Sequence, residues 1–165
     1  MDTQPIHPAV RVGHVHLRVS DLDRAVAFYR DALGFTVTAD AREIGLEMML
    51  LAAGDYHHHV GLNAWDAAGG PPPAGHAGLY HAAFVYPDRR ELGRAVRRLL
   101  DYGHAIDHAT DHGGTVSVYL CDPAGNGLEL YYDRPRSEWF GADGRPVLRN
   151  DRFDYRDLID QPEPR

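Results

Sequence analysis

An internal repeat constrains this chain of 165 residues more than any other feature. His14 and His81 each lie in a segment of alternating polar and apolar residues, seven residues before an aspartate, Asp21 or Asp88. After each aspartate, apolar residues recur at spacings of three and four, the period of a helix with one buried face. Three strand-like segments follow in each half. The sequence therefore predicts one unit twice: a strand, a helix and three more strands.

In the first half, the alternation predicts a strand over residues 11–19, with His14, His16 and Arg18 on its polar face. Ser20 or Asp21 is expected to cap the helix, and Gly34 to end it. Further strands are predicted over residues 35–41, 43–52 and 57–65.

In the second half, a strand is predicted over residues 79–86, followed by a helix that Asp88 caps and Gly103 ends. Strands are expected over residues 104–109, 115–121 and 127–132, the last two joined by the turn at 122–127.

We divide the chain into an N-terminal arm (1–9), a first βαβββ module (10–66), a Gly/Pro-rich linker (67–78), a second βαβββ module (79–133) and a C-terminal tail (134–165). The fold class predicted is α+β, and Trp139, Phe140 and Phe153 are the expected anchors of the tail.

Three residues on polar strand faces, His14, His81 and Glu129, form a candidate metal site. Leu128 and Leu130 flank Glu129, so Glu129 points to the polar face of its strand. Two imidazoles and one carboxylate can hold a divalent metal and leave coordination positions open. His16 shares the face of His14 and could replace it, but the seven-residue spacing to Asp21 favours His14.

Composition excludes several classes of function. The formal net charge of −7 argues against a general nucleic-acid binder, and no apolar run reaches the roughly 20 residues of a membrane span. Residues 1–8 lack an apolar stretch, so we expect no secretory signal. The single Cys121 fits a reducing cytoplasm, where we expect the protein to be located.

Four segments of the chain resemble the vicinal oxygen chelate (glyoxalase/bleomycin resistance/dioxygenase) superfamily, and within it the extradiol, catechol-2,3-dioxygenase-like branch. The resemblance lies in His14–Leu22 and Ala27–Phe35 of the first half, and in Leu79–His81 and Tyr119–Tyr131 of the second. It implies two tandem modules that form a cup-shaped mixed sheet around a metal. The implied metal ligands are His14, His81 and Glu129.

The resemblance also implies catalytic roles. It puts an acid/base histidine near His59, a substrate-binding tyrosine at Tyr119, and a histidine upstream of that tyrosine. His112, in an expected loop at 111–114, is our choice for the last of these, with His108 in reserve. Alternation puts His57 and His59 on one strand face with Asn63 and Trp65, and His58 on the other. We expect His16, His57, Asn63 and Trp65 to line the substrate pocket.

The function that these residues favour is an extradiol-type dioxygenase that cleaves a catechol-like aromatic ring with dioxygen. Iron(II) is the expected cofactor, and Mn(II), Ni(II), Zn(II) or Co(II) are alternatives. A glyoxalase- or epimerase-type isomerase, in which His59 would be a fourth ligand, is the second interpretation. A non-catalytic binder of an aromatic or antibiotic ranks last. The expected partners are a small aromatic substrate, dioxygen and a second copy in a homodimer, with neither nucleic acid nor membrane.

Overall fold

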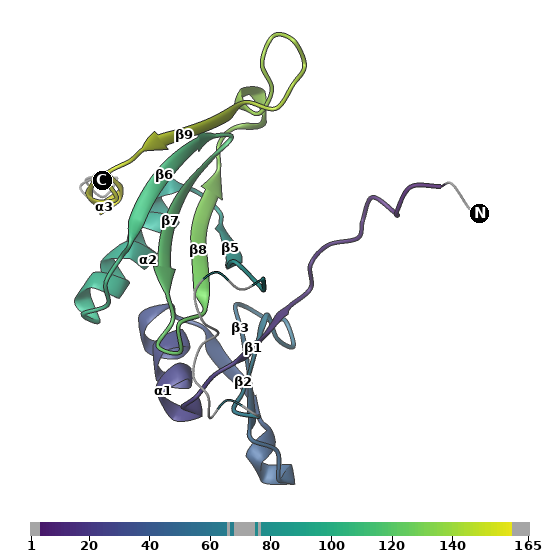
Figure 1. The fold of residues 1–165 in the computed structure, drawn as a ribbon, viewed down its shortest axis with the longest axis vertical. Coiled ribbons are helices and arrows are strands. Elements are labelled where there is room, and N and C mark those ends of the chain that lie inside the picture. Colours follow the sequence, from purple (N-terminus) through teal and green to yellow (C-terminus); the bar gives the residue numbers. More distant parts are fainter. Residues whose placement is uncertain (1–3, 66, 68–74, 76, 160–165) are drawn as a thin grey trace.

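Two β-sheets form the framework of the protein (Figure 1). The computed structural model describes residues 4–65, 67, 75 and 77–159. The first sheet has the strand order β1-β4-β3-β2 and the second the order β5-β8-β7-β6-β9. This arrangement confirms the α+β class and the repeated strand–helix–three-strand unit. Ladder hydrogen bonds join strands within each sheet, and none joins the two sheets within the described residues.

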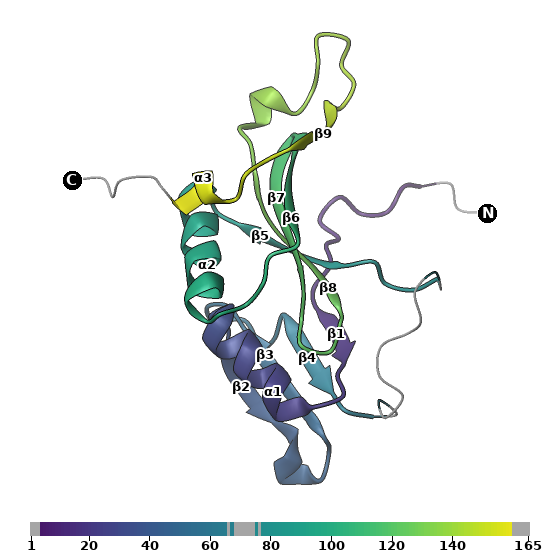
Figure 2. The same cartoon turned by 60° about the vertical axis from the view of Figure 1, so that its left-hand side comes forward.

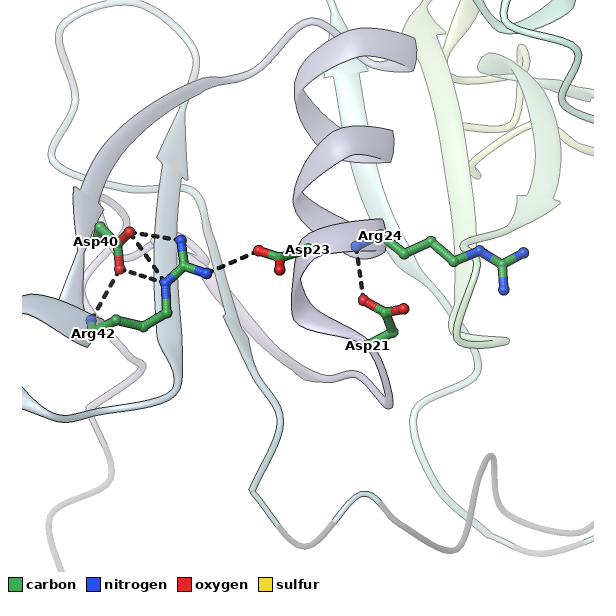
Figure 3. Close-up of polar contacts among 5 residues, drawn as sticks. All are labelled: Asp21, Asp23, Arg24, Asp40 and Arg42. Atoms are coloured by element: carbon green, nitrogen blue, oxygen red, sulfur yellow. Dashed lines mark hydrogen bonds and ion pairs between the residues drawn. The ribbon is translucent and has the colours of Figure 1, made fainter.

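The first module contains β1 (Val15–Arg18), α1 (Leu22–Ala27), β2 (Thr36–Asp40), β3 (Met48–Ala52) and β4 (Val60–Asn63). Asp21 caps α1 by accepting a hydrogen bond from the Arg24 backbone N–H at 2.9 Å, as predicted (Figure 3). The helix continues as a π-helical turn, η1 (Phe28–Ala32), and Gly34 ends it with φ of 85°. The turn buries both Phe28 and Tyr29.

The predicted strand over residues 43–52 is wrong in its first half. Asp40 accepts the backbone N–H of Arg42 and starts the 3-10 helix η2 (Ala41–Ile44), which Gly45 ends with φ of 81°. The guanidinium of Arg42 bridges Asp40 and Asp23, at 2.7 and 2.8 Å, and so ties this turn to α1 (Figure 3).

The predicted strand over residues 57–65 is also too long, since β4 begins only at Val60. Thr38 accounts for part of the difference, because its hydroxyl donates to the His57 carbonyl at 2.7 Å. The three consecutive histidines therefore precede the strand, and simple alternation does not set their orientation. His14 and His81 likewise lie one residue before β1 and β5. Both observed strands are therefore shorter than the strands predicted there.

The second module contains β5 (Ala82–Tyr86), α2 (Arg89–Asp101), β6 (His108–Gly113), β7 (Thr115–Cys121) and β8 (Gly127–Asp133). Asp88 caps α2 through the Glu91 N–H at 2.8 Å, and Gly103 follows the helix with φ of 81°, both as predicted. The strand predicted over residues 104–109 is displaced, because β6 pairs with β7 up to Asp111. The loop expected at 111–114 is therefore wrong, and His112 lies on a strand.

The tail adds a fifth strand to the second sheet. After the 3-10 turn η3 (Arg136–Glu138), β9 (Leu148–Arg152) pairs with β6, and α3 (Arg156–Ile159) packs on α2 (Figure 2). A Cβ on Gly93 of α2 would lie 2.3 Å from the Leu158 carbonyl oxygen, so only glycine allows this close approach. Of the expected anchors, Phe153 packs against the core and Phe140 is exposed.

A buried polar contact joins the two modules. The hydroxyl of Tyr29, on η1, donates to Asp122 Oδ2 at 3.1 Å in the turn between β7 and β8. Asn126 of the same turn donates to the Arg18 carbonyl at the end of β1, at 3.2 Å. The end of β1 therefore lies beside the start of β8, as both ribbon views show (Figures 1 and 2).

Helices α1 and α2 each cover one face of their own sheet and leave the other face for polar residues.

Most of the predicted linker falls outside the described residues. Among the residues that are described, no helix is long and apolar enough to cross a membrane.

Candidate metal centre and its hydrogen-bond network

Strand register brings polar side chains together on the second sheet, on the face turned away from α2. Tyr119 of β7 pairs with Glu129 of β8 on one side and with His108 of β6 on the other. Directly paired residues share a face of the sheet, so these three side chains lie in a row. The opposite face of β7 and β8 carries the buried residues Val116, Val118, Leu120, Leu128 and Leu130.

Two of the three predicted metal ligands converge. His81 Nε2 lies 2.9 Å from Glu129 Oε2, and both side chains are more than two-thirds buried. His81 Nδ1 is buried and has no hydrogen-bond partner among the residues that the structure describes. A divalent cation suits this pair, because a neutral imidazole nitrogen and a carboxylate oxygen are both good ligands for it.

Tyr119 extends the pair into a chain of hydrogen bonds. Its hydroxyl donates to Glu129 Oε1 at 2.9 Å and lies 2.8 Å from His112 Nε2. Burial, followed by the hydrogen bond to Glu129, raises the pKa of Tyr119 to about 12, so the phenol keeps its proton at neutral pH. His108 stacks on the Tyr119 ring at 4.6 Å between centroids and restricts its rotation.

His14, the third predicted ligand, lies in a different group of histidines. Its ring contacts that of His58 at 4.5 Å between centroids, and His57 Nδ1 lies 2.7 Å from His58 Nδ1. Burial, with the nearby His14, lowers the pKa of His58. Within the described part of the chain, no three His, Cys, Asp or Glu side chains are placed to hold a metal ion.

His59 lies next to the His14 group but has partners of its own. The backbone N–H of Ala53 donates to its Nδ1 at 3.2 Å, and the ring packs against Tyr56. The accepting Nδ1 carries no proton, so a neutral His59 has its proton on Nε2. No contact joins His59 to His81 or Glu129 among the residues described.

Three of the four predicted pocket residues lie on the polar face of the first sheet. The ring of His16 covers Gly61, whose Cβ would lie 2.9 Å from His16 Nδ1, and Trp65 lies 6.3 Å from His16 between ring centroids. Asn63 accepts the backbone N–H of Trp65. The fourth, His57, is exposed and packs on Tyr56.

Sequence reasoning missed two contacts of this region. It put His58 on the face opposite His59, whereas His58 contacts His14, because the histidines precede β4 and do not alternate with it. It also missed the Arg149 carbonyl, which lies 3.1 Å from His112 Nδ1. No signal in the sequence could have found the second contact, because a backbone carbonyl leaves no trace in residue type.

Comparison with known proteins agrees with this arrangement of modules. Residues 11–130 match the family described as the Glyoxalase/Bleomycin resistance protein/Dioxygenase superfamily. The chain belongs to this superfamily. Solved structures of members share its fold. A glyoxalase/dioxygenase from Nostoc punctiforme aligns with a TM-score of 0.66 at 23% identity, covering 82% of this chain and 100% of that one. Lactoylglutathione lyase from Agrobacterium tumefaciens gives 0.58 at 24% identity, over 76% and 96%.

Curated relatives within the superfamily carry dioxygenase names. The chain is 35% identical to catechol-2,3-dioxygenase of Bacillus subtilis (strain 168), covering 94% of this chain and 53% of that protein. It is 33% identical to biphenyl-2,3-diol 1,2-dioxygenase 3 of Rhodococcus globerulus, over 74% and 63%. The chain thus spans between half and two thirds of the length of these two relatives. Their names support the extradiol branch predicted from the sequence.

Proposed function

We propose that this protein is a metal-dependent dioxygenase of the extradiol type that acts on a catechol-like aromatic and dioxygen. The observation that carries the proposal is the hydrogen-bonded chain His81–Glu129–Tyr119–His112 on one face of the second sheet. The dioxygenase names of two relatives point to the same chemistry.

In this proposal His81, Glu129 and His14 hold the metal, and iron(II) is our choice, with Mn(II), Ni(II), Zn(II) and Co(II) as alternatives. The donor set fits, since two imidazoles and one carboxylate leave one positive charge on a divalent ion. For His14 to join, its ring must leave His58. When bound, the metal would favour the deprotonated form of a catechol and bring the substrate and dioxygen to one ion.

The side chains around this centre are assigned to proton transfer and substrate binding. Tyr119, protonated at neutral pH, turns its hydroxyl from Glu129 Oε1 to donate a hydrogen bond to an oxygen of the substrate. His112 Nε2, 2.8 Å away, is a second acceptor within hydrogen-bond reach of the Tyr119 hydroxyl and so helps to orient it. His59 presents its Nε2–H as a donor, because its Nδ1 is occupied by the Ala53 N–H. His16, His57, Asn63 and Trp65 shape the pocket wall.

Oxygen uptake by iron(II)-reconstituted protein is the test. We expect catechols, from catechol itself to phenyl-substituted ones, to give rapid uptake with a yellow ring-opened product. His112→Gln should keep its metal and lose turnover, whereas Thr115→Val, on the same face of β7, serves as a matched control. If no catechol supports uptake while one metal is bound per chain, the dioxygenase proposal fails and an oxygen-independent isomerase replaces it.

A homodimer is proposed alongside. Strands β1 and β2 are the edges of the first sheet, and β5 and β9 those of the second; none of the four has a second ladder partner within the described residues. Exposed strand edges in stable proteins are usually covered. Light scattering during size-exclusion chromatography should give twice the chain mass of 18.4 kDa, and a value of one chain mass would contradict the dimer.

A further inference from the structure

We propose that strand β9 of the C-terminal tail is a positioning element for the candidate site. Through the backbone carbonyl of Arg149, it holds His112 in the tautomer that leaves Nε2 free to accept a hydrogen bond from Tyr119. The inference rests on the proposed role of His112, and it assigns a part to residues beyond the 11–130 segment that matches the superfamily.

Two hydrogen bonds fix the orientation of His112. Nδ1 lies 3.1 Å from the Arg149 carbonyl oxygen, and Nε2 lies 2.8 Å from the Tyr119 hydroxyl. A carbonyl oxygen only accepts, so Nδ1 must carry a proton. In a neutral ring the other nitrogen then has a lone pair. The tail therefore determines that neutral His112 presents an acceptor to Tyr119.

A β-bulge brings the Arg149 carbonyl to this position. Asp111 pairs with Asp151 and Gly113 with Leu148, so two steps along β6 face three steps along β9. The extra residue lies on β9, opposite His112, where a bulge leaves a backbone group outside the regular ladder. The side chain of His112 forms a hydrogen bond with this carbonyl.

The tail is held in place by contacts on both sides of the bulge. Arg134 pairs with Asp111 at 2.6 Å, and Trp139 Nε1 donates to the Arg134 carbonyl at 2.7 Å. At the other end, the Phe153 N–H donates to the Ala109 carbonyl at 3.1 Å. These contacts fix the register of β9 and hence the position of its carbonyl.

The tautomer matters because Tyr119 has one hydroxyl proton and two neighbours that can accept it. Those neighbours are Glu129 Oε1 and His112 Nε2. With the proton on Nδ1, His112 can accept from Tyr119. With the proton on Nε2, it could only donate to the phenol oxygen. The Arg149 carbonyl thus makes neutral His112 an acceptor that competes with Glu129 for the hydrogen bond of the Tyr119 hydroxyl.

Long-range ¹H–¹⁵N spectra of the ring nitrogens test the inference. They would be recorded on the full chain at about pH 8.5, two units above the ordinary histidine pKa, with diamagnetic Zn(II) and without added metal. The His112 signals are those that vanish in His112→Gln. We expect Nδ1 to be protonated over Nε2 by about ten to one, the ratio that a hydrogen bond of about 1.4 kcal/mol produces.

A pair of glycine substitutions tests the role of β9. Gly113 has φ of 87°, and its added Cβ would lie 2.6 Å from Val147 Cγ1, so Gly113→Ala pushes against the segment leading into β9. Gly144 has a similar φ of 73° but open space around it, so Gly144→Ala adds comparable backbone strain without that push. We expect Gly113→Ala to bring the tautomer ratio near one to one, and Gly144→Ala to leave it unchanged.

Two outcomes would overturn the inference: a wild-type ring protonated on Nε2, or a folded Gly113→Ala variant with the wild-type ratio. The wild-type spectrum decides even if Gly113→Ala does not fold. Because the readout is a tautomer ratio and not turnover, it stands whether or not catechols support oxygen uptake. Failure of the dioxygenase proposal would therefore be seen separately.

Discussion

The two modules have the same topology but carry very different polar faces. Each begins with a strand, and in each an aspartate at the equivalent position caps the helix, Asp21 in one and Asp88 in the other. In the second module, close polar contacts of 2.8–3.1 Å connect His81, Glu129, Tyr119 and His112, and continue to the Arg149 carbonyl of the tail. In the first, the histidines mainly contact one another through their rings. Repetition of the fold therefore provides equivalent positions, while the chemistry is distributed unequally between them.

The largest effect is expected from breaking the pair in the second module. Glu129→Ala and His81→Ala should each abolish tight metal binding, because each removes a proposed ligand and leaves the other without its partner. Metal content after dialysis, by elemental analysis, checks this. Tyr131→Phe, two residues along the same face of β8, should bind as the wild type does. Stoichiometric metal in Glu129→Ala would refute the ligand assignment.

A smaller effect on the metal separates the two histidines that meet in the first module. His14→Ala should weaken metal binding at least tenfold, whereas His58→Ala should leave it unchanged or tighten it, because His14 must leave His58 to reach the metal. Competition with a chromophoric chelator measures both affinities. If His58→Ala loses the metal and His14→Ala keeps it, His58 is the ligand.

Sequence periodicity predicted most of the second module because its elements follow simple rules. Strand β7 has the predicted bounds, and the helix cap Asp88 and the terminating Gly103 are where the spacing put them. Tyr119 and Glu129 share a face because alternation within a regular antiparallel pair leaves no other register. His112 was chosen from the resemblance, and the structure puts it next to Tyr119.

The failures occur where tertiary contacts override periodicity. The Asp40–Arg42 contact turns a predicted strand into a 3-10 helix, and the register of β4 leaves three histidines outside any strand. Strand β9 pairs with β6, which lies almost 40 positions earlier in the chain. No local sequence pattern predicts this pairing. These features depend on contacts between residues far apart in the sequence, and the local pattern of a single sequence does not predict such contacts.

The buried contact between the modules, at Tyr29 and Asp122, should contribute to the free energy of unfolding according to the number of its hydrogen bonds. Asp122 is buried and accepts from the backbone N–H groups of Ala124 and Asn126 and from the Tyr29 hydroxyl. Asp122→Ala should cost about 2–3 kcal/mol, because it leaves several buried donors unsatisfied. Tyr29→Phe removes one of these bonds and should cost about 1 kcal/mol. Urea unfolding monitored by circular dichroism measures both, and equal losses would contradict this account.

The smallest effect is expected at the ion pairs of Arg42, which have no counterpart in the second module. Hydrogen bonds from the Arg42 side chain and backbone N–H lower the pKa of Asp40. A lowered pKa in the folded state adds stability that is present above the unfolded pKa, about 3.9, and is lost as the pH falls through the folded value. Arg42→Ala should therefore lower the urea midpoint slightly at pH 7, and this deficit should shrink toward zero as the pH falls below about 4. The control is Arg145→Ala, at an exposed ion pair in which Arg145 Nε lies 3.9 Å from Asp143 Oδ2, and it should show neither effect. A deficit in Arg42→Ala that persists unchanged at low pH would mean that Arg42 acts through packing and not through its charge.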